Sequence, residues 1–271
     1  MIDLQVLWSL LPLLLLTGVF AGVLAGLLGV GGGIIIVPIL FHLLTGFGIE
    51  TSLAMPLAVG TSLSTIVLTS IVSARKHYLK GGVDMALVKA WSLPVLLGVV
   101  IGSLAPLVID GAQVKTVFGF MLVIVSLHMF AGSYRNLELF EHLPKGKLQS
   151  ALAILVGGFS ALLGIGGGTL MVPLLTTFSF TIHRAVSTAS VFGLIISVPA
   201  TVVYIASGWG LADLPPFTTG YVNWVIFVIV VPMTMLFAPL GVKLAYSLNV
   251  TQLKRAFAIF LCLVGLKMVF I

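Results

Sequence analysis

Two glycine clusters stand inside long apolar runs and constrain the fold more than any other feature of the sequence. The first is Gly29–Gly33 (GVGGG), with Pro38 in the apolar run that follows; the second is Gly164–Gly168 (GIGGG), with Pro173 in the same place. The glycines and the prolines each recur 135 residues apart. In a membrane, such a break leaves backbone N–H and C=O groups that lipid cannot satisfy. Two matching breaks predict a transport site; the alternative is a close-packed or kinked patch without ligand contact.

The composition places the chain in a membrane. Of its 271 residues, 60% are hydrophobic and 7% are charged, and the mean hydropathy is +1.27. A soluble domain carries about 25% charged residues. Long apolar runs with internal Gly and Pro indicate helices, because a membrane barrel needs short alternating strands. The net charge of +6 sits between the apolar runs and indicates membrane orientation, with no nucleic-acid partner. Cys262 is the one cysteine, which excludes disulfides and thiolate metal sites, and no cofactor or metal is predicted.

The apolar runs divide into eight predicted helical segments, in two repeats at residues 1–131 and 150–271 joined by a polar linker at 132–149. The piece after each glycine break has about a dozen residues, near 18 Å, which is too short for a ~30 Å core. A basic loop is expected after the second segment, with Arg75, Lys76, His77, Lys80 and Lys89. The segments are expected at Val6–Leu28 resuming as Ile34–Leu44, Leu53–Ser73, Met85–Ile109, Val114–Ala131, Leu148–Leu163 resuming as Thr169–Phe180, Ala185–Ala206, Tyr221–Leu244 and Leu253–Ile271.

The two halves repeat beyond the glycines. AVGTSL at Ala58–Leu63 matches AVSTAS at Ala185–Ser190. QVKTVFGFMLVIVSLHM at Gln113–Met129 matches QLKRAFAIFLCLVGLKM at Gln252–Met268. An internal duplication of this kind is typical of secondary transporters, whose site lies at the interface between repeats.

The distribution of Lys and Arg favours one topology over another. If each half crosses the membrane four times, the repeats are parallel and the basic residues divide 8 against 5 between the faces. If each glycine-broken segment is instead a hairpin that enters and leaves on one side, the repeats are inverted. Arg184, Lys243, Lys254 and Arg255 then join the main group, and only Lys115 and Lys267 oppose 11 others. The positive-inside rule therefore favours inverted repeats with hairpins at segments 1 and 5, and both termini outside.

Inverted hairpins would bring two short-helix N-termini together near the membrane midplane. Helix N-termini carry unpaired N–H groups and a positive dipole end, so they bind anions, and glycine lets an anion approach the backbone. Hydroxyls from the second and sixth segments could add hydrogen bonds, although such groups also bond to their own helix or link helices. The predicted substrate-binding residues are Gly29, Gly31, Gly32, Gly33, Ile34, Thr61, Ser62 and Thr65 in one half, and Gly164, Gly166, Gly167, Gly168, Thr169, Ser187, Thr188 and Ser190 in the other.

Few ionisable residues fall within the predicted spans. His183 is a candidate proton carrier, although a histidine at a helix end is more often an interfacial residue. An intramembrane enzyme or redox carrier would need paired carboxylates, a His cluster or a Cys pair in the spans, and none is present. A cation transporter would want acidic residues at the breaks, where the sequence has none.

The paired breaks resemble a known family. LLGVGGGIIIVPIL and LLGIGGGTLMVPLL, each followed by an A-V-G/S-T run, together with LPPFTTGYVN at Leu214–Asn223, resemble the sulfite exporter TauE/SafE family over nearly the whole chain. The resemblance implies a multi-pass protein of the bacterial inner membrane that moves small sulfur-containing anions such as sulfite or sulfonates, mostly outward. Its partners would be this anion and membrane lipid, with a homo-oligomer left open. Pro56-Leu57 stand where the second repeat has His183-Arg184, so His183 has no counterpart.

Overall fold

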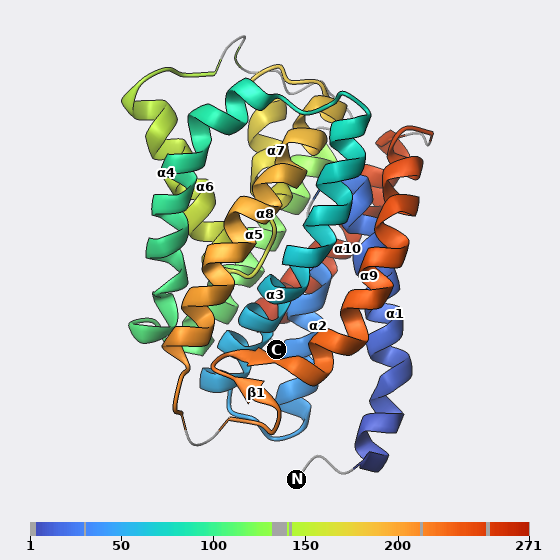
Figure 1. The fold of residues 1–271 in the computed structure, drawn as a ribbon, viewed down its shortest axis with the longest axis vertical. Coiled ribbons are helices and arrows are strands. Elements are labelled where there is room, and N and C mark those ends of the chain that lie inside the picture. The colour runs from blue at the N-terminus through green and yellow to red at the C-terminus, as the bar shows by residue number, and fades with distance from the viewer. Residues whose placement is uncertain are drawn as a thin grey trace.

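The computed structural model describes residues 4–29, 31–131, 140, 143–211, 214–247 and 250–270, and almost all of this is helix (Figure 1). In chain order the elements are α1 (Leu4–Leu28), α2 (Gly33–Gly46), α3 (Thr51–Leu79), α4 (Met85–Ser103), the short 3-10 turn η1 (Ala105–Leu107), α5 (Gly111–Ala131), α6 (Lys147–Leu162), α7 (Gly168–Thr177), α8 (Ile182–Ser207), β1 (Thr218–Thr219), β2 (Val222–Asn223), α9 (Trp224–Ala245) and α10 (Val250–Phe270).

The all-α multi-pass class is confirmed. Six of the described helices are long and apolar enough to cross a membrane, namely α1, α3, α4 with its 3-10 extension, α5, α8 and α9. The helices that follow the glycine breaks, α2 and α7, have 14 and 10 residues, so neither reaches across a ~30 Å core. Most of the linker expected at 132–149 lies outside the described residues, although α6 already begins at Lys147.

The basic loop expected after the second segment is wrong for four of its five residues. Arg75, Lys76 and His77 belong to α3, which continues to Leu79, and Lys89 belongs to α4, so only Lys80 lies between the two helices. The His77 side chain is buried at 1% exposure. The extra helical turns are stable because the polar side chains that face inward find partners: His77 Nε2 lies 3.0 Å from the carbonyl oxygen of Gly26 in α1.

Two prominent helix pairs each join one helix from the first half of the chain to one from the second half. α1 packs along α9, and α4 packs along α6, at opposite sides of the bundle in Figure 1. Glycines set the close approach of both pairs: Gly22 faces the backbone of Thr234, and the equivalent Gly157 faces the backbone of Val95. By the sequence repeats, α1 corresponds to α6 and α4 corresponds to α9, so the two pairs join corresponding helices.

The equivalent helices α5 and α10 run antiparallel. Gly119, early in α5, contacts Gly265 and Val269 late in α10, whereas the Ser126 hydroxyl, late in α5, donates to the carbonyl oxygen of Ala258 at 2.7 Å. Antiparallel packing of two equivalent helices is the relation that inverted repeats require.

The charged groups gather at two ends of the bundle. At one end, the start of α8 meets the connection between α3 and α4, and Arg184 Nη2 lies 2.6 Å from Asp84 Oδ2. At the other end, Lys115 lies over the ring of Phe41, and Lys267 lines a pocket together with His42. A four-crossing arrangement of each half would set Arg184 and Asp84 on opposite faces, whereas the hairpin arrangement sets them on the same face.

Candidate functional site

The first glycine cluster forms a left-handed turn between α1 and α2. Gly29, Gly31 and Gly32 have φ angles of 65°, 75° and 85°, a region that side chains with a Cβ rarely adopt. Gly164 repeats the first of these with a φ of 65°, whereas Gly167 is right-handed, with φ −50°. The short helices α2 and α7 begin at Gly33 and Gly168, one residue before Ile34 and Thr169, where the sequence had placed their starts.

The two glycine loops touch each other. A Cβ on Gly31 would lie 3.4 Å from the Cα of Gly166, and a Cβ on Gly33 would collide with the carbonyl oxygen of Gly164. The Ser62 hydroxyl donates to that same carbonyl oxygen at 2.8 Å, so α3 also holds the second loop. The structure therefore brings together residues more than 130 positions apart, and it holds the loops closed against one another.

The back of each loop rests on the other repeat. A Cβ on Gly29 would lie 2.5 Å from the carbonyl oxygen of Val186, and a Cβ on Gly164 would lie 2.8 Å from the Cα of Val59. Val59 and Val186 are the valines of the repeated A-V runs. Each glycine loop thus packs on the A-V run of the opposite half, and the described residues of both loops are buried.

Two of the predicted hydroxyls accept hydrogen bonds from the N-cap residues of other helices. The backbone N–H of Asn223 donates to Thr61 Oγ1 at 2.9 Å, and the backbone N–H of Asp84 donates to Thr188 Oγ1 at 2.9 Å. Asn223 and Asp84 are the N-caps of α9 and α4, and each side chain accepts from the backbone N–H three residues later. Thr61 and Thr188 therefore make equivalent contacts, each of which connects its helix to the N-cap residue of a helix in the opposite half. We call each threonine–cap contact a joint.

The other hydroxyls divide between the helix backbone and a histidine. Thr65 donates to the carbonyl oxygen of Ser62, and Ser190 donates to that of Ser187, both at 2.7 Å. Ser187 Oγ lies 3.1 Å from His77 Nδ1. Thr65 and Ser190 thus fit the alternative that such hydroxyls bond to their own helix.

Thr169 is the exception among the predicted hydroxyls. It is the second residue of α7, it is 3% exposed, and its Oγ1 has no hydrogen-bond partner within the described part of the chain. Leaving a buried hydroxyl unpaired costs about 1–3 kcal/mol. A polar ligand atom at the start of α7 would remove this cost.

Ile34 and His183 are the two remaining predicted residues, and their surroundings differ. Ile34 is fully buried at the start of α2 and lines one end of a pocket of about 550 Å³ that extends along α2 to Phe47. His183 is exposed at the start of α8, and its Nε2 lies 3.2 Å from the carbonyl oxygen of Ala245. The structure does not bring His183 to the glycine loops. Among the described histidines, the buried one is His77, which the sequence had placed in a loop and which contacts the carbonyl oxygen of Gly26 in α1.

Comparison with known proteins assigns the chain to a family. The family model described as sulfite exporter TauE/SafE matches residues 14–268. The chain belongs to the sulfite exporter TauE/SafE family. It is 33% identical over 257 residues to a probable membrane transporter protein of Haemophilus influenzae, covering 94% of this chain and 97% of that one.

Other members of the TauE/SafE family match over a similar extent. A probable membrane transporter protein of Methanocaldococcus jannaschii is 27% identical over 266 residues, covering 96% of this chain and 95% of the relative. No solved structure matches the chain. Within the part of this family member that the structure describes, no group of three His, Cys, Asp or Glu side chains is placed to hold a metal ion. The family and the six long apolar helices together make this a multi-pass membrane transporter.

Proposed function

We propose that this protein is a secondary transporter of small sulfur-containing anions, such as sulfite or sulfonates, and that it moves them outward. The observation that carries the proposal is the meeting of two glycine loops, one from each repeat, at the start of two short helices. The unpaired N–H groups and dipole ends of α2 and α7 favour an anion, and glycine allows its close approach. The name of the family, and not a feature of the site, supports sulfur-containing anions.

The substrate would bind between the loops after they part. In the present structure a methyl group on Gly33 would already strike Gly164, so an anion does not fit there without movement. The interlocked repeats supply a route to that movement, because rocking one half against the other separates loops that rest on opposite halves. The closed contact therefore fits an occluded stage of alternating access.

The topology that we propose is a pair of inverted hairpins, α1–α2 and α6–α7, with the basic end of the bundle in the cytoplasm. The antiparallel packing of α5 and α10 supports it, as does the ion pair between Arg184 and Asp84. Residues from both ends of the hairpin, Leu10 in α1 and Phe47 after α2, also line one pocket. The chain thus returns to the end at which α1 begins.

Transport assays in proteoliposomes test the proposal. Flux of sulfite, thiosulfate, sulfoacetate and sulfate is compared, with a membrane potential of either sign, since outward movement of an anion is driven by a potential that is negative inside. We expect at least one sulfur oxyanion to move faster than chloride. Flux of a cation alone would contradict the proposal. Flux of a different small anion or metabolite, or net import, would favour the alternative that the protein is a transporter of another small anion or metabolite, or an importer.

The loop contact itself can be tested with Gly33→Ala. The added Cβ collides with the carbonyl oxygen of Gly164, so closing the loops would cost about 1–3 kcal/mol of overpacking. We expect flux to fall about tenfold or more at normal expression. Gly46→Ala is the matched control in the same helix, because a Cβ there meets nothing within 4 Å. Equal flux in both variants would refute the loop assignment.

A further inference from the structure

A second cavity lies at the basic end of the bundle, apart from the glycine loops. It has a volume of about 440 Å³. Its walls come from the connection between α3 and α4, the start of α8 and the residue after α9; they include Lys80, Asp84, His183, Arg184 and Tyr246. Three of these five side chains are basic or can become so, and one is acidic. The cavity is thus suited to an anion by charge.

The other end of the molecule shows that the fold does not need these charges. The segment KGGVD at Lys80–Asp84 corresponds to TGYVN at Thr219–Asn223, and both Gly81 and Gly220 have positive φ angles. The threonine-to-cap hydrogen bond is 2.9 Å long at both ends. The charged residues differ, however: Lys80, Asp84, His183 and Arg184 correspond to Thr219, Asn223, Pro56 and Leu57. One joint is charged and its structural duplicate is neutral.

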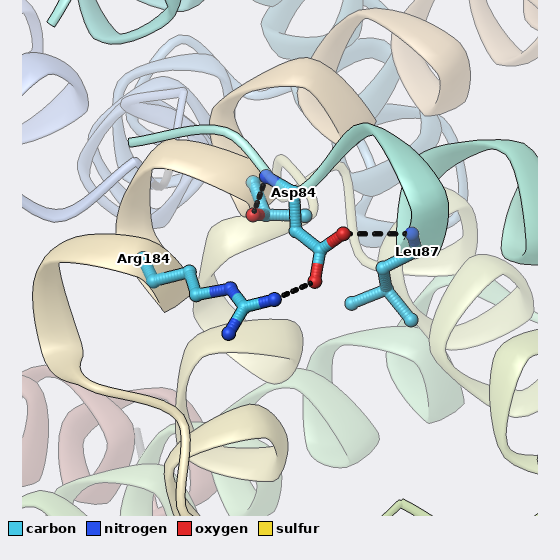
Figure 2. Close-up of polar contacts among 4 residues, drawn as sticks. Asp84, Leu87 and Arg184 are labelled. Atoms are coloured by element: carbon cyan, nitrogen blue, oxygen red, sulfur yellow. Dashed lines mark hydrogen bonds and ion pairs between the residues drawn. The ribbon is translucent and has the colours of Figure 1, made fainter. Parts of the chain in front are cut away.

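Arg184 is held in a fixed position at this cavity. Figure 2 shows the Asp84 carboxylate between two donors: Oδ1 accepts from the backbone N–H of Leu87 at 3.0 Å, and Oδ2 accepts from Arg184 Nη2 at 2.6 Å. The Arg184 guanidinium also lies 4.8 Å over the ring of Phe180. The Arg184 side chain is nevertheless 57% exposed, and among the described residues its remaining N–H groups have no acceptor. Those donors are oriented and available.

The other groups around the cavity add positive potential. Lys80 Nζ lies 5.6 Å over the ring of Tyr246 and forms no ion pair with any residue that the structure describes. Thr181, the N-cap of α8, gives no side-chain hydrogen bond to the helix, so the first N–H groups of α8 stay open. Two carbonyl oxygens near the cavity already have partners: that of Ala245 lies 3.2 Å from His183 Nε2, and that of His77 accepts from the backbone N–H of Gly82.

We propose that this cavity is an admission site, at which a small oxyanion binds before it reaches the glycine loops. The proposal rests on the proposed function for the identity of the anion, but the binding itself does not. Lys80 and the free N–H groups of Arg184 would hold the oxyanion, and Asp84 would keep Arg184 in place. Ser187 links the cavity to the interior, because its Oγ lies 3.4 Å from the Tyr246 hydroxyl and 3.1 Å from buried His77.

Protection of Lys80 tests the binding without any transport. The full chain in discs of zwitterionic lipid is treated with an amine-reactive reagent, in sodium sulfate or in sodium chloride of equal ionic strength, and labelling is read by mass spectrometry. We expect sulfate to slow the labelling of Lys80 and not of Lys267, an exposed lysine at the other end of the bundle. Equal protection of both lysines would overturn the site. Protection that needs anionic lipid in the discs would assign the cavity to a lipid headgroup and would also overturn it.

A charge-stripped variant tests the role in admission. Lys80→Thr, Asp84→Asn and Arg184→Leu together give this end the residues that the neutral end already carries, so folding is expected to persist. When the anion is supplied on the side of the membrane where the cavity opens, we expect its half-saturating concentration to rise about tenfold, with the maximal rate unchanged. Lys267→Gln, which removes one charge from the opposite end, should leave it unchanged. An unaltered half-saturating concentration in the triple variant would overturn the proposal. Sulfate protection of Lys80 in a protein that moves no sulfur oxyanion would sustain the site and reject only the transport function.

Discussion

At the scale of single residues, the candidate site depends on which polar atoms are already in use. Thr61 and Thr188 serve helix caps, and Thr65 and Ser190 serve their own helix. Thr169 alone among the predicted hydroxyls is buried without a partner in the described chain. Sequence patterns found all of these residues as a class. They could not separate them, because only the packing decides which hydroxyl meets a backbone N–H or C=O group.

Thr169→Val separates binding from folding. Valine has nearly the same shape and removes a hydroxyl whose burial without a partner costs about 1–3 kcal/mol. We therefore expect the thermal stability of the ligand-free protein to stay level or rise, while the stabilisation by added anion falls. Thermal unfolding with and without the transported anion measures both. Thr169→Ser, which keeps the hydroxyl, should retain the anion effect; loss of that effect in the serine variant and not in the valine variant would contradict the assignment.

At the scale of elements, the same joint is built twice. The loop before α4 ends in Asp84 and the loop before α9 ends in Asn223; each residue caps its helix and donates its backbone N–H to a threonine of the opposite repeat. The repeated A-V runs indicated the duplication in the sequence. The crosswise connection was not predicted, because Thr61 and Asn223 lie 162 positions apart and no local pattern joins them.

Thr61→Val and Thr188→Val test this joint. Each change leaves one backbone N–H without its acceptor, which costs about 1–3 kcal/mol when the group is buried. We expect both variants to be destabilised, Thr61→Val by the larger amount, because its lost hydrogen bond is buried and that of Thr188 is partly buried. Denaturation of the detergent-solubilised protein measures the loss. Thr116→Val is the matched control, since its exposed hydroxyl bonds only to the carbonyl oxygen of Ala112 in the same helix. Stability of both joint variants at the level of this control would contradict the structural role.

At the scale of the whole molecule, charge counting and packing favour the same arrangement. The hairpin topology was predicted from an 11-to-2 division of basic residues. In the structure, Lys115 and Lys267, the two exceptions, lie at the end that holds His42, whereas Arg184 lies at the end that holds Asp84. Most helix boundaries were predicted within about three residues because glycine, proline and charge mark them, whereas the end of α3 was placed six residues too early because its basic residues suggested a loop. The closed loop contact was beyond prediction, since it depends on how two distant backbones meet.

Labelling of single cysteines from each side of the membrane tests that arrangement. Cys262 is first replaced by Ser, and cysteines are then placed at Gln5, Glu50, Lys80 and Thr181 in turn. Gln5 and Glu50 stand near the start of α1 and after the end of α2, so a hairpin puts both on one face. Lys80 and Thr181 line the same cavity and belong to the opposite face. We expect an impermeant thiol reagent to label Gln5→Cys and Glu50→Cys from outside the cell, and Lys80→Cys and Thr181→Cys only in inverted vesicles. If α1 and α2 instead crossed as one broken span, Gln5→Cys and Glu50→Cys would label from opposite faces, and the two loops could not meet as the ends of inverted hairpins.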